Sequence, residues 1–220
     1  MDAPAARPVG HHAGVSEPQD AFTRLAWPVQ TERLLLRPLE PGDAPAAHAF
    51  RTRPEVDRWM GGRPGDGEEF AAWFTRPERA AKTLVVLHDD RLVGDLMLAV
   101  GDGWSQVDVA DAAAGTEAEL GWCFDPAYGG RGLATEAVRA LLAICFDPQT
   151  GLGLRRVTAG CFAGNAPSWR LMERVGMRRE AHGVADALHR DLGWVDGYTY
   201  ALLASEWRAA AGGGSRRVGA

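Results

Sequence analysis

A cluster of glycines between two apolar segments is the feature that most limits what this chain can fold into. Residues 129–132 read Gly-Gly-Arg-Gly; they follow a strand-like run at residues 118–124 and lead into an apolar stretch that continues to Phe146. Glycines let a backbone adopt positive φ and approach a ligand closely. N–H groups at the start of the following helix then point at an anion, and the helix dipole favours negative charge there. Arg131 adds a charge-assisted donor. The pattern predicts a strand-to-helix turn that binds a phosphate or a pyrophosphate.

Two other phosphate-binding motifs fit this loop poorly. A P-loop ends in Gly-Lys-Ser or Gly-Lys-Thr, whereas this loop has Gly132, Leu133 and Ala134. A dinucleotide-binding fold has G-x-G-x-x-G in its first strand–helix unit, with an acidic residue about 20 residues later. Here four expected strands precede the loop, Thr135 replaces the third glycine, and the next strand ends without a carboxylate. A glycine-rich turn without a ligand is the simpler alternative.

The remaining patterns predict one mixed α/β domain. Strands are expected at residues 33–39, 83–88, 92–100, 118–124, 155–162, 180–188 and 194–203, and helices at 43–51, 68–74, from the glycine cluster to 146, and 166–175. The order βααβββαβαββ predicts a mostly antiparallel sheet of about seven strands, flanked by helices. Residues 101–117 form a long loop or a widened hairpin. We expect a mobile arm at residues 1–25, the domain at 26–208 and a disordered tail at 209–220.

Charge and composition exclude several classes of function. The 220-residue chain has 24 Lys and Arg against 29 Asp and Glu, and a net charge of −5 argues against a nucleic-acid binder. An acidic surface does fit a cationic substrate. The most apolar stretch, residues 137–146, is half of the roughly 20 residues that a membrane span needs. The first 20 residues lack the apolar run of a secretory signal. Three dispersed cysteines predict reduced thiols and a cytoplasmic location, and no metal site is expected.

The chain contains the strings AELGWCFDPAYGGRGLATEAV and, after one strand, NAPSWRLMERVGM, in register with an opening T-E-R-L-x-L-R strand. Together they resemble the GCN5-related N-acetyltransferases (GNAT), and most closely the ribosomal-protein alanine N-acetyltransferase (RimJ/RimL-type) branch. The resemblance covers about residues 30–207. It implies the GNAT fold, acetyl-CoA as donor and a homodimer.

The resemblance also assigns the donor site. The family's diphosphate signature falls on Gly129, Gly130, Arg131, Gly132, Leu133 and Ala134, with Thr135 following in the same helix turn. Gly129 departs from the family, in which Gln, Arg or an aromatic residue is usual at this position. Arg131 would then supply a larger share of the contacts to the diphosphate. The pantetheine arm would pair with the backbone of Trp122, Cys123 and Phe124.

The helix after the fifth expected strand carries further candidates. In the resembling branch a serine at Ser168 protonates the CoA thiolate, and Asn165 helps to place the pantetheine. The alternative for Ser168 is a first-turn serine bonded to the backbone. A basic residue at Arg174 often reaches the adenosine 3′-phosphate in the family, and Arg170, one turn earlier, is a second candidate. Solvent exposure of either arginine is the alternative.

A general base is also needed, because transfer requires a neutral amine. Glu119 is the candidate, since a carboxylate on a central strand near the thioester can accept a proton directly or through water. A surface salt bridge is its alternative role. Asp186, His182 and His189 on the penultimate strand are the other candidate bases. Cys123 has no activating neighbour in its strand, so core packing is expected instead of an acetyl-cysteine intermediate.

The tryptophans divide by position. Trp122, Trp169 and Trp194 lie within expected elements and are predicted to be core. Trp59 and Trp73 lie in the early helical region, which in the family walls the acceptor site, so they are candidate substrate-binding residues; ordinary burial is the alternative.

These observations predict a cytoplasmic, acetyl-CoA-dependent N-acetyltransferase that works by direct transfer in a ternary complex. The acceptor is a primary amine, either a protein N-terminus or a small amine such as an aminoglycoside, a polyamine or an amino-acid derivative. Three alternatives stay open: a longer donor such as succinyl-CoA, a CoA-binding sensor without catalysis, and a purely structural domain.

Overall fold

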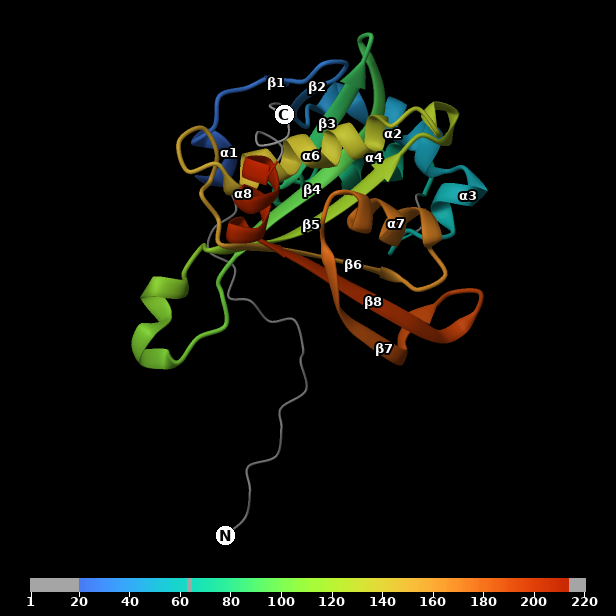
Figure 1. Ribbon diagram of the computed structural model, residues 1–220. Helices are drawn as coiled ribbons and strands as arrows, with labels where there is room; N and C mark the ends of the chain where they lie inside the picture. The colour runs from blue at the N-terminus through green and yellow to red at the C-terminus, as the bar shows by residue number, and fades with distance from the viewer. Residues whose placement is uncertain (1–19, 63–64, 214–220) are drawn as a thin grey trace, which may run out of the picture.

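The sheet runs through the whole molecule. The structure, a computed structural model, describes residues 20–62 and 65–213. In that part an eight-stranded sheet has the order β1-β2-β3-β4-β5-β6-β8-β7 (Figure 1). The strands are β1 (Val29–Gln30), β2 (Leu35–Pro38), β3 (Thr83–His88), β4 (Arg91–Gly101), β5 (Glu117–Phe124), β6 (Arg156–Phe162), β7 (Arg178–His189) and β8 (Gly193–Leu203). All neighbouring strands are antiparallel except β5 and β6. The predicted mixed α/β class with a mostly antiparallel sheet is confirmed.

Helices cover both faces of the sheet. They are α1 (Asp20–Thr23), α2 (Ala44–Arg51), α3 (Pro54–Asp57), α4 (Gly67–Phe74), α5 (Pro77–Ala80), α6 (Leu133–Phe146), α7 (Ala166–Arg174) and α8 (Ala204–Gly213). One core forms where α6 and α7 pack on Leu96 and Leu120, and a second where Phe50 of α2 and Phe70 and Phe74 of α4 pack on the other face. Because successive strand residues point to opposite faces, the buried strands β3 and β4 supply apolar side chains to both cores.

The sheet opens between β5 and β6. These two strands pair only where Glu117–Glu119 faces Arg156–Thr158. Beyond that point β5 stays paired with β4 as far as Phe124, and β6 stays paired with β8 as far as Phe162. Beyond Glu119 in β5 and Thr158 in β6, the facing edges of these two strands are therefore separated by a gap. Among the strands that the structure describes, none pairs with the backbone along these edges.

The chain ends differ from the sequence prediction at their inner boundaries. Phe22 of α1 is buried in the core beneath the sheet, so residues 20–25 are not part of an arm; residues 1–19 lie outside the described residues. Helix α8 continues to Gly213, past the expected start of the tail. Strand β1 and the helices α1, α3, α5 and α8 were not predicted. The first four have only two to four residues, which show too little periodicity.

Two tryptophans of the described residues are exposed, one in the β4–β5 connection and one at the start of β8. The β4–β5 hairpin closes at Gly101 opposite Glu117, and the expected long loop between them holds a 3-10 helix, Val107–Ala113, that stands away from the sheet (Figure 1). Trp104 in this loop is almost fully exposed. The prediction that Trp194 is core is wrong: it lies beside the β7–β8 turn and is 65% exposed. Trp122 and Trp169 do pack against the core.

Candidate active site

The glycine loop has the backbone conformation that its sequence predicts. Gly130 and Gly132 have φ of +73° and +78°, and Gly132 is the N-cap of α6. Within the described residues, the backbone N–H groups from Gly130 to Thr135 donate to no protein acceptor; the ladder of α6 begins with the bond from Glu136 N to Gly132 O, 3.0 Å. The Leu133 side chain is buried in the core, so only its backbone is available to a ligand. Consecutive free N–H groups in such a turn form a concave anion site.

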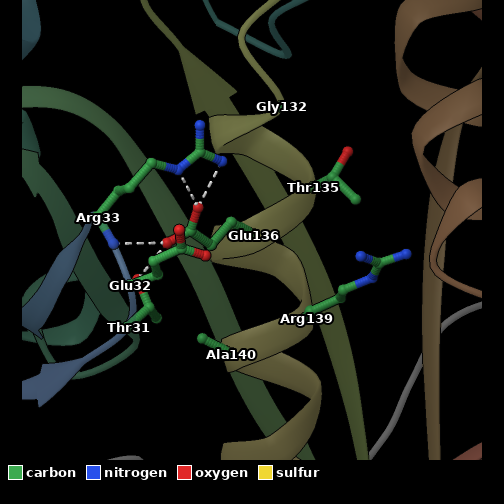
Figure 2. A pocket seen from close by; sticks show the side chains of 8 residues that line it. All are labelled: Thr31, Glu32, Arg33, Gly132, Thr135, Glu136, Arg139 and Ala140. Carbon is green, nitrogen blue, oxygen red and sulfur yellow. Dashed lines mark hydrogen bonds and ion pairs between the residues drawn. The ribbon is translucent and has the colours of Figure 1, made fainter.

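Side chains on the outer side of α6 hold this loop in place. Arg33 donates from Nε to Glu136 (2.7 Å) and from Nη1 to the carbonyl oxygen of Arg131 (2.9 Å). The Thr31 hydroxyl donates to the second oxygen of Glu136 at 2.6 Å. Thr31, Arg33 and Glu136 line a depression of about 610 Å³. Figure 2 shows Thr135 and Arg139 pointing away from the Arg33–Glu136 pair. The network ties the loop to the N-terminal strands.

Arg131 is itself engaged by neighbouring aromatic rings. Its guanidinium lies 3.0 Å from Nε2 of His88 and 5.6 Å from the centre of the Tyr128 ring. An arginine can only donate, so Nε2 of His88 accepts, and Nδ1 then donates to the Arg33 carbonyl oxygen at 3.1 Å. The Arg131 side chain is therefore oriented by protein contacts before any ligand binds.

A second cavity, of about 490 Å³, occupies the gap between β5 and β6. Its walls come from β4, β5, β6, β8 and the bulge of β7, with Trp59 and Met60 following α3 and with Arg51 and Arg79 from the α2–α5 region. Leu120, Gly121 and Trp122 form the β5 wall. Of the predicted pantetheine residues, Trp122 therefore lines the cavity. Cys123 is buried in the other core, where burial raises its pKa to about 12, and Phe124 packs over Gly94. The expected core role of Cys123 is confirmed.

Ser168 and Asn165 both line this cavity, at the start of α7. Ser168 is hydrogen-bonded to the Cys161 thiol; burial raises the pKa of that thiol to about 11, and the hydroxyl group acts in the opposite direction. Asn165 is the N-cap, but its side chain makes no capping bond, so its amide is available to the cavity. The Ser168 hydroxyl thus lies at the cavity wall beside the Cys161 thiol.

The candidate bases fall in different places. Glu119 lies on the same face of β5 as Gly121 but is exposed and does not line the cavity. Asp186 does line it: the strand register shifts between Gly183 and Ala187, and the bulge folds the Asp186 carboxylate over Gly183 and Gly197. An added Cβ at either glycine would lie within 2.8 Å of that carboxylate, so a side chain there would displace it. Bulges of this kind re-aim a side chain.

The two candidate histidines are occupied elsewhere. His189 is buried, lies 2.8 Å from the Arg58 carbonyl oxygen through Nε2, and accepts the Asp191 N–H at Nδ1. His182 is half exposed and pairs with Asp196 at 2.6 Å, outside the cavity. Both histidines therefore have structural partners, and Asp186 is the penultimate-strand candidate that faces the cavity.

The cavity between β5 and β6 is also lined by charged residues from α2, α5 and β4 that the sequence analysis did not identify. Arg51 and Asp95 form a buried bidentate pair, with Arg51 Nε 2.9 Å and Nη2 2.5 Å from the two carboxylate oxygens. Arg79 lies beside them, half-buried, with its guanidinium 3.6 Å from the centre of the Trp73 ring. The one available signal was Asp95, a charged residue in the middle of an otherwise apolar strand; nothing in the sequence marked either arginine.

The candidate aromatic residues divide similarly. Trp59 lines the cavity, and its ring lies so close to Gly164 that an added Cβ there would be 3.1 Å away. Trp73 stands behind Arg79 and stacks on Phe74, without lining the cavity. Arg174 and Arg170 are exposed on α7, with Arg170 over the Trp169 ring, and neither lines a described cavity.

Two further findings concern only the described residues. None of their helices is long and apolar enough to span a membrane. Within residues 20–62 and 65–213, no group of three or more His, Cys, Asp and Glu side chains is arranged to hold a metal ion.

Comparison with known proteins identifies similar chains. The acetyltransferase (GNAT) domain family matches residues 33–178. A Bacillus subtilis protein named uncharacterized N-acetyltransferase YnaD is 30% identical over 182 residues, which are 81% of this chain and 98% of that protein. The crystal structure of a GNAT-family acetyltransferase from Bacillus anthracis has a TM-score of 0.67 at 29% identity, covering 80% of this chain and 98% of that one.

A more distant structure carries a relevant ligand. It is RimL, a ribosomal L7/L12 alpha-N-protein acetyltransferase, in complex with coenzyme A; its TM-score is 0.61 at 15% identity, covering 79% of this chain and 95% of that one. At this identity the likeness extends to the fold alone.

Proposed function

Because this chain belongs to the acetyltransferase (GNAT) domain family and is an N-acetyltransferase, we propose that it transfers an acetyl group from acetyl-CoA to a primary amine within a ternary complex. Direct transfer needs the amine and the thioester to be held side by side, so proximity supplies much of the rate. The gap between β5 and β6 is the place in this molecule where both fit.

The observation that carries the proposal is this gap together with the glycine loop that follows β5 in the chain. The loop offers free N–H groups from Gly130 to Thr135 to the diphosphate, with Gly129 at its entrance and Ala134 in the first helical turn. The unpaired edge of β5 at Trp122, Cys123 and Phe124 can pair with the amides of the pantetheine arm. Arg174 at the end of α7 is proposed to meet the adenosine 3′-phosphate.

The chemistry requires one proton to be removed and one to be supplied. Asp186 accepts the ammonium proton, since it lines the cavity with Ser168; Glu119 could serve only through water, because it lies outside the cavity wall. The amine nitrogen then bonds to the acyl carbon, and the carbon–sulfur bond breaks. Ser168 protonates the departing thiolate, and Asn165 positions the pantetheine.

The finer expectations from the sequence belong to this proposal. They are the RimJ/RimL-type branch, a protein N-terminus or a small amine as acceptor, an acetyl group in preference to succinyl, a homodimer and a cytoplasmic location. The RimL structure supports the first only at the level of the fold.

Acetyl transfer to a panel of primary amines tests the proposal, with free CoA thiol and acetylated product both measured. Ser168→Ala should lower kcat about 100-fold, because a general acid contributes that much or more, and should leave acetyl-CoA affinity within a factor of about three. The matched control is Ser205→Ala, an exposed serine in α8. Binding of acetyl-CoA without transfer to any amine would favour a CoA-binding sensor, and absence of binding would reject the donor site.

A further inference from the structure

The cavity contains a cation, Arg79, for which the described residues form no direct ion pair. Arg79 lines it and is half-buried, yet within the described residues its guanidinium forms no ion pair and makes no hydrogen bond. Burial, and then repulsion from Arg51, lower the pKa of Arg79 from its ordinary value, and attraction from Asp95 and Glu78 offsets only part of this effect. An arginine keeps its charge in any case, so the protein leaves a positive charge poorly compensated at this end of the cavity.

The other charged groups of the lining compensate for it only in part. They are Arg51, Asp95 and Asp186. Asp95 is committed to Arg51, with one bond to each carboxylate oxygen, and both of these side chains are only 6% exposed. Asp186 lies over Gly183 and Gly197, on the hairpin of β7 and β8. The cavity thus presents a carboxylate on that hairpin and, on α5, a guanidinium without a direct ion pair to the described residues.

We propose that the acceptor is a small amine that also carries a carboxylate, and that Arg79 binds this carboxylate. The inference rests on the proposed function, because it assigns the substrate class of the same site. The amine meets Asp186 and loses its proton, its nitrogen takes the acetyl group from sulfur, and Ser168 supplies a proton to the thiolate. The carboxylate is unchanged throughout and orients the molecule.

Trp73 acquires a role in this arrangement as a positioning residue. It lies flat beneath the Arg79 guanidinium at 3.6 Å and so fixes where the cation stands. The remaining wall is largely apolar, with Trp59, Met60, Met97 and Phe162. An amino acid with an apolar side chain has the three features that this cavity distinguishes: an amine, a carboxylate and an apolar group. A polyamine would place a second cation against Arg79.

The experiment compares each of several apolar L-amino acids with its own carboxamide, which differs only in lacking the carboxylate charge. The wild-type enzyme should prefer the acid by about tenfold or more in kcat/KM, mainly through KM, as expected for one charge-assisted contact. Arg79→Met should abolish the preference, and Arg79→Glu should reverse it. Trp73→Leu should reduce it while acetyl-CoA binding is retained. Arg76→Met, an exposed arginine that precedes α5, is the matched control and should keep the wild-type preference.

The outcomes separate this inference from the proposed function. Equal use of acids and carboxamides, or an unchanged preference in Arg79→Met, overturns the inference while acetyl transfer stands. Preference for polyamines or for peptides over every acid in the panel overturns it as well. Acetyl-CoA affinity, measured by calorimetry for every variant, reports on the donor site alone, and its absence in the wild type would refute the proposed function instead.

Discussion

The donor side and the acceptor side of the proposed site use different chemical groups. The donor side is backbone: Gly130 and Gly132 set the turn, and the N–H groups that follow face outward. The acceptor side is made of side chains, in which Arg79 and Asp186 come from a four-residue helix and a bulged hairpin that are far apart in the sequence. Ser168, at the start of α7, lines the cavity where the two sides meet.

This difference predicts which substitutions each side tolerates. A backbone site survives loss of most side chains, provided that its glycines and the network that anchors it remain. A site made of side chains tolerates backbone strain elsewhere, but removal of a single carboxylate or guanidinium abolishes its function. Donor chemistry is then common to every protein that shares the loop, whereas acceptor choice is set by a few replaceable residues.

The largest expected effect separates the two candidate bases on the acceptor side. Asp186→Asn should lower kcat/KM for the amine by about 100-fold or more, because it removes the proton acceptor. Glu119→Gln is the matched substitution and should change it by less than about threefold, because Glu119 is exposed and outside the cavity. Steady-state kinetics at several pH values measure both. A larger loss in Glu119→Gln than in Asp186→Asn would transfer the role of base to Glu119.

The second largest expected effect is a loss of acetyl-CoA affinity on the donor side. It is tested with two glycines that have the same backbone conformation. Gly132→Ala and Gly193→Ala both force alanine into the left-handed region, at φ of +78° and +74°, and each should cost roughly 1–2 kcal/mol of stability. Only Gly132→Ala places a methyl group in the anion loop, so only that variant should lose about tenfold in acetyl-CoA affinity. Calorimetric titration and thermal unfolding give the two quantities separately. Equal affinity in both variants would mean that the loop does not bind the donor.

The smallest effect tests the network that anchors the loop. Burial acts to raise the pKa of Glu136, but hydrogen bonds from Thr31 and Arg33 and the Arg33 charge outweigh it, so the pKa is lowered. The stability that Glu136 contributes is therefore present above the unfolded-state pKa of about 4.3 and is lost as the pH falls through the lower folded-state value.

Glu136→Gln should consequently destabilise the protein by about 1 kcal/mol at neutral pH, a discounted value because Arg33 is 40% exposed. The difference from wild type should shrink below about pH 4. Urea unfolding across this range measures it, and Glu55→Gln, an exposed glutamate in α3, should show no such pH dependence. A constant difference between Glu136→Gln and wild type at all pH values would contradict the proposed role of the carboxylate charge.

The contrast between backbone and side-chain construction also explains what the sequence could predict. The glycine turn, α6, and the strands β3 to β6 were predictable, because their signals are contiguous and periodic. The family resemblance covered the same segments. Ser168 and Asn165 were predictable because they keep a fixed spacing within one helix turn.

The acceptor side could not be predicted in the same way. Asp186 enters the cavity only because β7 is bulged, and a one-residue shift would turn it to the other face. Arg79 depends on the stacking of Trp73, and the pairing of Arg51 with Asp95 joins α2 to β4 across the core. Such contacts between distant segments leave no local pattern. Glu119, chosen as a carboxylate on a central strand near the expected thioester, does not line the cavity.

The central claim is that acetyl-CoA occupies the gap between β5 and β6 and rests on the glycine loop. Amide hydrogen exchange with and without acetyl-CoA, resolved to single residues, tests it most directly. Amides of the unpaired edge at Trp122–Phe124 and of the loop at Gly130–Thr135 should gain protection, and those of Glu117–Glu119, already paired with β6, should not change. Unchanged exchange in both the edge and the loop, under conditions where acetyl-CoA is bound, would contradict the account.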